Sequence, residues 1–191
     1  ILVKTEAEGK TKMHEMNEKY VPYRGYDAPY IFVSYAHKDG NEASEVIEKL
    51  QMEQYRVWYD EGIDPGTEWD ENIAEHIENC EYFIALLSRE YLVSSNCKDE
   101  LNFARELEKP RLLIYLEDIQ LPGGMRMRLS RLQAIHKYKY QSMELFFEKL
   151  AETQGLEKCH EKQKQEKTII IESTEVVQET PRITIPRQGY P

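Results

Sequence analysis

Short apolar runs alternate with helical stripes through the middle of the chain. Five runs are rich in β-branched and aromatic residues, which predicts strands. They cover residues 30–35, 56–60, 82–87, 112–116 and 133–137. The third run is apolar throughout, as a central strand of a parallel sheet should be when both of its faces are covered.

Helical periodicity fills most of the gaps between these runs. Apolar residues recur at helical spacing after the first and second strands, namely Ala43, Val46, Ile47 and Leu50, then Trp69, Ile73 and Ile77. A third helix is expected to begin near the capping residues 94–96, and a last one covers residues 143–150. The stretch around Pro122, with two glycines after it, is predicted to be a loop. Alternation of this kind predicts an α/β fold, a parallel sheet with helices on both faces, in which ligands bind beyond the carboxyl ends of the strands.

The predicted domain occupies residues 30–154, and the two ends of the chain differ from it. Residues 1–29 lack periodicity and end in a stretch rich in Pro, Gly and Tyr, which predicts a linker. The chain begins with Ile1 rather than Met, so this linker is expected to continue from an upstream region. Residues 155–191 are rich in Lys, Glu and Gln and then in Pro, which predicts a disordered tail. Two short apolar runs in it leave open that it adds a strand to a sheet edge.

The net charge of −10 lies in the predicted domain, because each end of the chain holds equal numbers of acidic and basic side chains. An acidic domain disfavours nucleic acid, which needs a basic face, and it repels anionic membrane surfaces. No apolar run approaches the length of a membrane span. Neither nucleic acid nor a membrane is therefore an expected partner.

The three cysteines, Cys80, Cys97 and Cys159, provide no even disulfide framework. Reduced thiols in the cytoplasm are the simplest interpretation. Although His160 follows Cys159, no second pair stands at ligand spacing. No metal site is predicted.

Glu100 is the candidate catalytic residue. On a helical wheel it falls about 300° from Cys97, inside the stripe expected to be buried. The other members of that stripe are Leu101, Ala104 and Leu107. A carboxylate aimed inward is unfavourable unless it is paired or functional, although a first-turn acid can also simply favour the helix N-terminus. With Asn96 as the N-cap, Asp99 takes the capping-box position, which leaves Glu100 unexplained by capping.

The connection 61–66 is the candidate interaction loop. Gly62 and Gly66 permit unusual backbone dihedrals, and Pro65 stiffens the turn between them. Ile63 would be exposed at the tip, where connections commonly carry function. An ordinary turn from a strand to a helix would have the same spacing, so this alternative stays open.

Three segments, in this order, resemble the motifs of bacterial TIR (Toll/interleukin-1 receptor-like) domains. Residues 30–39 resemble the first motif, a strand ending in Ser-Tyr followed by a polar loop. Residues 56–66 resemble the second strand and its BB loop, and residues 96–101 resemble the third motif, where NAD-cleaving TIR domains keep their catalytic glutamate. The resemblance implies a flavodoxin-like three-layer fold with a five-stranded parallel sheet of order 2-1-3-4-5.

The same resemblance implies cleavage of the nicotinamide–ribose bond of NAD⁺ by a glycohydrolase or ADP-ribose cyclase in bacterial defence, signalling or virulence. NAD⁺ would be the substrate, and no cofactor is implied. Glu100 would stabilise the oxocarbenium-like ribose. Lys38 or His37, with helix N-termini and loop amides, would offset the diphosphate. The residues implied to bind the substrate are Ser34, Tyr35, Ala36, His37, Asp64, Trp69, Asn96 and Cys97.

Asn96 departs from the family pattern, because many active relatives have Trp at this position. Weaker packing of nicotinamide or ribose, or an altered product, would follow. Active TIR domains also self-associate head-to-tail and complete each site with a neighbour's BB loop, so other TIR domains are implied partners. The alternative function is a non-enzymatic interaction module that acts through the BB loop.

Two other proteins of similar fold are excluded by the strand ends. A phosphoacceptor receiver domain needs an Asp at the end of the third strand, where this chain has residues 86–88, Leu-Leu-Ser. A flavin-binding flavodoxin would carry a phosphate loop after the first strand, and residues 36–39, Ala-His-Lys-Asp, do not form one.

Overall fold

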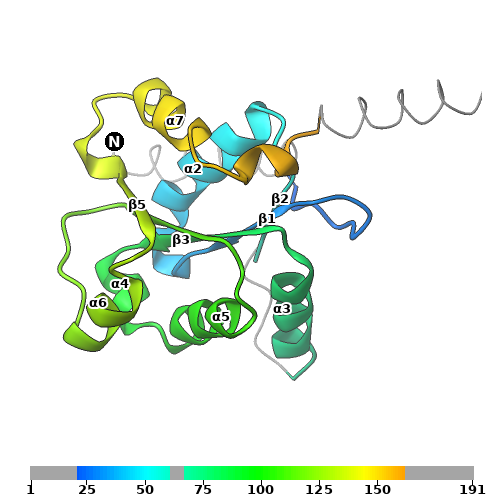
Figure 1. Ribbon diagram of the computed structural model, residues 1–191, viewed down its shortest axis with the longest axis horizontal. Helices are drawn as coiled ribbons and strands as arrows, with labels where there is room; N and C mark the ends of the chain where they lie inside the picture. The colour runs from blue at the N-terminus through cyan, green and yellow to red at the C-terminus, as the bar shows by residue number, and fades with distance from the viewer. Residues whose placement is uncertain (1–20, 61–66, 162–191) are drawn as a thin grey trace, which may run out of the picture.

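Five parallel strands form the centre of the molecule (Figure 1). The computed structural model describes residues 21–60 and 67–161, with residues 67–70 described by their backbone alone. The strands are β1 (Ile31–Ser34), β2 (Val57–Tyr59), β3 (Tyr82–Leu87), β4 (Arg111–Tyr115) and β5 (Gln133–His136). Their order is β2-β1-β3-β4-β5, which confirms the flavodoxin-like order expected from the sequence. In the register, Ser34 lies beside Ala85, so the chain leaves β1 and β3 at the same edge.

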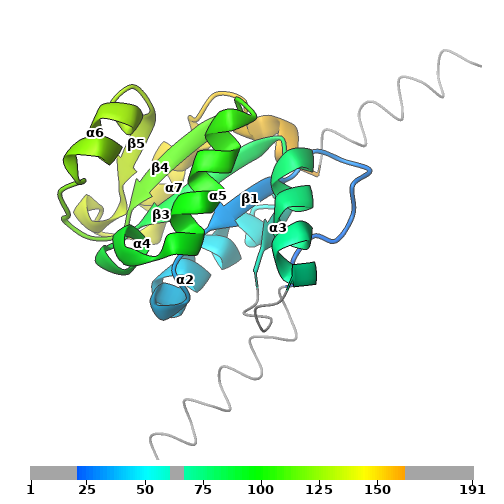
Figure 2. The same cartoon turned by 90° about the horizontal axis from the view of Figure 1, so that it is seen from below.

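Helices cover both faces of this sheet (Figures 1 and 2). On one face lie α2 (Gly40–Met52) and α7 (Met143–Ala151), and on the other lie α3 (Thr67–Asn79), α5 (Ser95–Glu106) and α6 (Gly123–Leu129). The short helix α4 (Arg89–Val93) follows β3. The 3₁₀ turns are η1 (His37–Asp39), η2 (Lys137–Lys139) and η3 (Leu156–Cys159).

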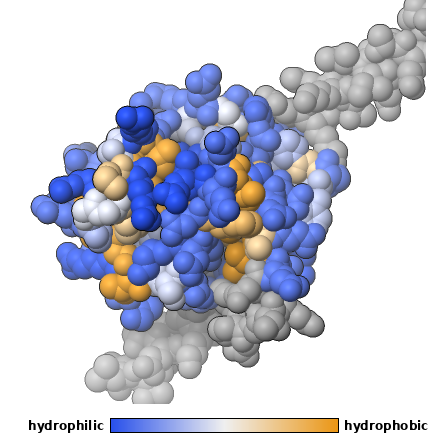
Figure 3. Space-filling model, turned by 60° about the horizontal axis from the view of Figure 1, so that its bottom comes forward, coloured by the Kyte–Doolittle hydropathy of each residue, from blue (hydrophilic) through white to orange (hydrophobic). Residues whose placement is uncertain are grey.

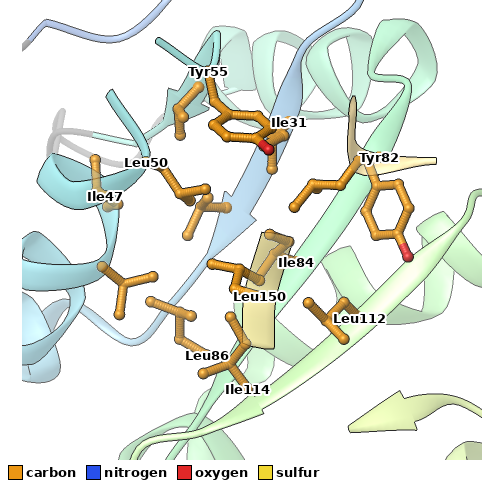
Figure 4. Packing of buried hydrophobic residues seen from close by; sticks show 14 of the residues in the cluster. Ile31, Ile47, Leu50, Tyr55, Tyr82, Ile84, Leu86, Leu112, Ile114 and Leu150 are labelled. Atoms are coloured by element: carbon orange, nitrogen blue, oxygen red, sulfur yellow. The ribbon is translucent and has the colours of Figure 1, made fainter. Parts of the chain in front are cut away.

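The sheet divides the core into two clusters because successive side chains of a strand point to opposite faces. In β3, Ile84 packs with one cluster and Phe83 with the other, so the whole strand is buried and apolar. Figure 4 shows the first cluster, in which Leu50 of α2 and Leu150 of α7 lie with Ile84 and Ile114. Burying one such side chain stabilises the fold by about 1.5–3 kcal/mol.

The strand predictions are confirmed to within one residue at each end. Two helices were not predicted. Helix α4 has five residues, too few for a periodic signal. Helix α6 occupies the stretch predicted to be a loop, so that prediction is wrong. Two glycines disfavour a helix there, but Leu129 is buried and Met125 packs against the second cluster, and packing outweighs propensity.

The packed part of the chain is longer at both ends than the predicted range 30–154. On the amino-terminal side, the Tyr23 amide donates to the Val57 carbonyl of β2 at 2.8 Å. On the carboxyl-terminal side, His160 forms an antiparallel bridge with Tyr55, and Leu156 is fully buried. Residues 155–161 therefore belong to the fold rather than to a tail.

Arg56, just before β2, joins these two ends. Its buried guanidinium donates to three backbone carbonyls, at 2.7, 3.3 and 3.2 Å, and these belong to Pro29, Lys158 and His160. A buried charge needs such hydrogen bonds to be tolerated. Arg56 thus attaches the segments that enter and leave the domain to one point at the amino-terminal edge of the sheet.

The face shown in Figure 3 is mostly hydrophilic, with hydrophobic side chains gathered in narrow strips between hydrophilic ones. In the part of the chain that the structure describes, no helix has the length and apolar character needed to cross a membrane.

Candidate functional site

A pocket of about 280 Å³ opens at the carboxyl ends of the strands, where ligands of parallel α/β sheets bind. Its walls come from four parts of the chain. These are the end of β1 with the turn that follows it, the residue after β2, helix α4, and the start of α5. The lining residues are 32–38, Asp60, Glu90, Val93, Ser94, Asn96, Cys97 and Glu100.

Glu100 points from α5 toward the end of β1. Its Oε2 atom lies 2.5 Å from the hydroxyl of Ser34, which donates a hydrogen bond to it when the carboxyl is ionised. This contact confirms the predicted inward direction of the side chain. Cys97, Leu101 and Ala104 are buried on the same face of the helix, as predicted.

Two details of the predicted helix are wrong. The N-cap is Ser94, whose hydroxyl accepts from the Cys97 amide at 3.3 Å, and Asn96 lies inside the first turn. Asp99 is therefore not at a capping-box position. Leu107 follows the last helical residue and is 37% exposed, so it does not belong to the buried stripe.

Burial raises the pKa of Glu100 to about 7, the hydrogen bond from Ser34 lowers it, and the nearby carboxylates of Asp60 and Asp99 raise it further. The residue as a whole is nevertheless not fully buried. A carboxyl group with this pKa exchanges its proton near neutral pH. It can therefore act as an acid, a base or an anionic stabiliser of a developing positive charge.

Ser34 is itself part of a buried hydrogen-bond chain. Its hydroxyl lies 3.0 Å from the phenolic oxygen of Tyr91 in α4, and that phenol donates to the Cys97 carbonyl at 3.1 Å. Tyr91 is fully buried. Burial raises the pKa of the Cys97 thiol to about 12, which disfavours its thiolate form.

Two basic side chains on the turn after β1 face carboxylates. A ring nitrogen of His37 lies 2.8 Å from Asp60, and the ammonium group of Lys38 lies 2.7 Å from Glu90. Asp39, next along the turn, accepts a short hydrogen bond from Ser88. The two groups expected to offset a diphosphate thus already have anionic partners inside the protein.

A second hollow adjoins Glu100 on its other side, between α3 and α5. Its walls are mainly apolar and include Ile73, Ile77 and Phe103. Asn96 and Glu100 border both hollows.

Most of the sequence-predicted binding residues lie together. The pocket brings Glu100 into one lining with Ser34, Tyr35, Ala36, His37, Asn96 and Cys97. Asp64 and the predicted loop residues Gly62, Ile63, Pro65 and Gly66 lie outside the described residues, as does the side chain of Trp69.

Sequence reasoning missed Tyr91 and Asp60 as members of the site. Asp60 ends the second predicted strand, so its place at the carboxyl edge was a usable signal. Tyr91 follows a predicted strand end by four positions and carried no pattern of its own. Among the described residues, no three His, Cys, Asp or Glu side chains gather as metal ligands would.

Comparison with known proteins places this geometry in a family. The TIR domain of the Toll-related receptor TRR-2 from Hydra magnipapillata is 19% identical with a TM-score of 0.54, over 63% of this chain and 94% of that one. This likeness shows the fold. The Clostridium botulinum CMP N-glycosidase BcmB is 17% identical with a TM-score of 0.49, over 64% of this chain and 98% of that one.

A 2-desoxiribosyltransferase from Leishmania mexicana is 19% identical with a TM-score of 0.39, over 66% of this chain and 99% of that one. At these scores, neither this enzyme nor BcmB bears on the function of the present protein. No curated protein sequence matches. The family model described as "TIR domain" matches residues 31–151, which is more than half of the chain, and the chain therefore belongs to the TIR domain family.

Proposed function

We propose that this TIR domain is an NAD⁺ glycohydrolase or ADP-ribose cyclase that cleaves the nicotinamide–ribose bond. The observation that carries the proposal is the carboxyl group of Glu100, held by Ser34 in a pocket at the carboxyl edge of the sheet. It occupies the position that the family resemblance assigns to the catalytic glutamate.

The chemistry suits a single carboxylate. Nicotinamide leaves NAD⁺ as a neutral molecule, so no general acid is needed. The ribose becomes oxocarbenium-like, and a nearby anion stabilises that positive charge while it accepts hydrogen bonds from ribose hydroxyls. Only ionised Glu100 can do this, and the Ser34 hydroxyl favours the ionised form by donating to it.

The diphosphate of NAD⁺ needs positive partners in an acidic domain. Lys38 is largely exposed, with 78% of its side chain open to solvent, and its pair with Glu90 is a surface contact. Exposed ion pairs are held weakly, so a phosphate group could replace Glu90 as the partner of Lys38. The exposed imidazole of His37 could shift from Asp60 to the substrate in the same way.

A non-enzymatic interaction module is the alternative, and Asn96 favours it. This exposed amide stands where the family resemblance expects an aromatic wall for nicotinamide. A TIR domain without that wall could still bind other TIR domains. The two functions differ in whether nicotinamide is released.

The test is nicotinamide release from NAD⁺ by concentrated protein, so that assembly is not limiting. We expect Glu100→Gln to lower the rate at least 100-fold, the usual effect of removing a group that stabilises charge in the transition state. Glu106→Gln, an exposed change on the same helix, is the matched control and should keep the parent rate. Equal release from the parent and Glu100→Gln would refute the catalytic assignment. Absence of release from both would favour the interaction module.

A further inference from the structure

Four oxygen atoms form a continuous chain between α5, β1 and α4. Glu100 Oε2 lies 2.5 Å from Ser34 Oγ, Ser34 Oγ lies 3.0 Å from the Tyr91 hydroxyl, and that hydroxyl lies 3.1 Å from the Cys97 carbonyl oxygen. All three contacts are within hydrogen-bond distance. The chain therefore has three places for a hydrogen atom.

The number of hydrogens available depends on Glu100. Ser34 and Tyr91 carry one hydroxyl hydrogen each, whereas a carbonyl and an ionised carboxylate can only accept. With Glu100 ionised, two hydrogens serve three contacts, and one contact stays empty. With Glu100 protonated, the carboxyl donates to Ser34, Ser34 donates to Tyr91, and Tyr91 donates to Cys97, so every contact is filled.

We propose that Tyr91 is a positioning residue that acts on Glu100 through Ser34. The three hydrogen bonds of this chain are all made when Glu100 carries a proton. When the proton leaves, the Ser34 hydroxyl donates to Glu100 instead of to Tyr91. The released proton passes to water, because Glu100 is partly open to solvent. Ser34 then turns its hydrogen toward the carboxylate. The catalytic meaning of this chain rests on the proposed function, whereas the chain itself does not.

Tyr91 is held where it can do this. The Ser88 hydroxyl caps α4 by accepting from the Tyr91 amide at 2.9 Å, and it donates to Asp39 on the turn after β1. Because the ring is fully buried, the phenol cannot turn to water, and Ser34 and Cys97 are its hydrogen-bond partners among the described residues. The chain thus couples the turn after β1, helix α4 and the carboxyl group of α5.

Charged and titratable groups from several neighbouring elements lie around Glu100. The carboxylates of Asp60, after β2, and Asp99, on α5, act on Glu100 directly. Glu90, His37, Lys38 and Cys97 line the same pocket, Asp39 on η1 acts on Cys97, and the Tyr91 phenol is affected by Glu100. His37 lies against Asp60, and Lys38 pairs with Glu90. Burial raises the pKa of Glu100 to about 7, so both directions of the chain are populated near neutral pH.

The two hydroxyls should act in opposite directions. Tyr91→Phe removes two hydrogen bonds from the protonated chain and one from the ionised chain, so it should lower the pKa of Glu100 by roughly half to one pH unit. Ser34→Ala removes two neutral hydrogen bonds from the protonated chain and the charge-assisted hydrogen bond to the carboxylate from the ionised chain. The bond to the ion is the stronger kind, and the Ser34 hydrogen bond lowers the pKa of Glu100, so this variant should raise that pKa. A purely structural role for these residues does not predict opposite signs.

The experiment follows the side-chain carboxyl carbon of Glu100 by NMR from pH 4 to 9 in ¹³C-labelled protein. Glu100→Gln identifies the resonance, and Tyr82→Phe, in the core cluster on the other face of the sheet, is the control that should leave the midpoint unchanged. In the parent protein, the Tyr91 ring signal should move with the same midpoint as Glu100, which tests the chain without any substitution.

Shifts of the same sign in Tyr91→Phe and Ser34→Ala would overturn the proposal, as would a Tyr91 signal that ignores the titration of Glu100. Nicotinamide release is measured on the same samples. Opposite shifts without release would leave the chain standing and refute the proposed function. Nicotinamide release without opposite shifts would support the proposed function and refute the hydrogen-bond chain.

Discussion

Arg56 and Glu100 are two charged groups drawn into the fold at opposite edges of the same sheet. Arg56 lies at the amino-terminal edge, where its guanidinium donates to three backbone carbonyls. Glu100 lies at the carboxyl-terminal edge, where the Ser34 hydroxyl is its hydrogen-bond partner among the described residues. The first charge is satisfied inside the protein, and the second keeps capacity to bind something else.

This difference separates a structural charge from a candidate functional one. A buried ion whose hydrogen bonds are filled by backbone stabilises the fold and has little to offer a ligand. Glu100 lies beside a pocket, and burial raises the pKa of its carboxyl group to about 7. Burial of such a group does not stabilise the fold, which is why we interpret it as functional. Three substitution or titration experiments test the contrast.

The largest expected effect belongs to Arg56→Met. Removing the guanidinium leaves three buried or part-buried carbonyls without their donor, so the free energy of unfolding should fall by about 4 kcal/mol. Urea denaturation at pH 7 measures this. Arg105→Met, an exposed change on α5, is the control and should cost less than about 0.5 kcal/mol. If the two variants lost equal stability, Arg56 would not be the structural charge described above.

Glu100→Gln should act in the opposite direction. Burial raises the pKa of the folded carboxyl group from its ordinary value of 4.5 to about 7, so the folded state holds this proton more tightly than the unfolded state. The protonated carboxyl group therefore contributes to the free energy of unfolding below pH 4.5, and this contribution is lost as the pH rises through 7. Between pH 4.5 and pH 8, the free energy of unfolding of Glu100→Gln should therefore rise by roughly 3 kcal/mol relative to that of the parent.

Urea denaturation of the parent and variant at both pH values measures the gain, since all other ionisable groups are common to the two proteins. Glu106→Gln should show no such growth with pH. A constant difference between Glu100→Gln and the parent would mean that the carboxyl group ionises in the fold as easily as it does in the unfolded chain.

The smallest effect is the pH dependence of nicotinamide release. Only the ionised carboxylate stabilises the ribose cation, so the rate should fall about tenfold per pH unit below pH 7 and level off above it. Initial rates from pH 5 to 8 provide the profile. His37→Ala should keep the same midpoint, which separates Glu100 from the imidazole that pairs with Asp60. A flat profile would contradict the assignment.

The strands and the direction of Glu100 were predictable because each depends on a local pattern. The apolar run 82–87 is strand β3 residue for residue, since both of its faces are buried. The helical wheel placed Glu100 with Cys97 and Leu101, and those two residues are buried beside it. Spacing along one element is enough for this kind of inference.

The predictions that were wrong or missing depend on a choice between two adjacent residues of similar propensity, or on contacts between residues far apart in the sequence. Ser94 and Asn96 are both good caps, and only the folded chain selects Ser94. Tyr91 reaches Ser34 across 57 positions of sequence, so no local pattern could reveal the contact. Helix α6 forms because Leu129 finds a place in the core, which its own sequence does not encode.

The three hydrogen bonds donated by Arg56 have a mechanical consequence. The carbonyls of Pro29 and His160, on the two flanking segments, accept hydrogen bonds from the same guanidinium, and the bridge between Tyr55 and His160 lies next to it. Tension applied between the flanking segments would be borne by these few bonds at one corner of the molecule. The load would bypass the carboxyl edge of the sheet, so a pull on the segments around residues 29 and 160 would leave the geometry around Glu100 unchanged.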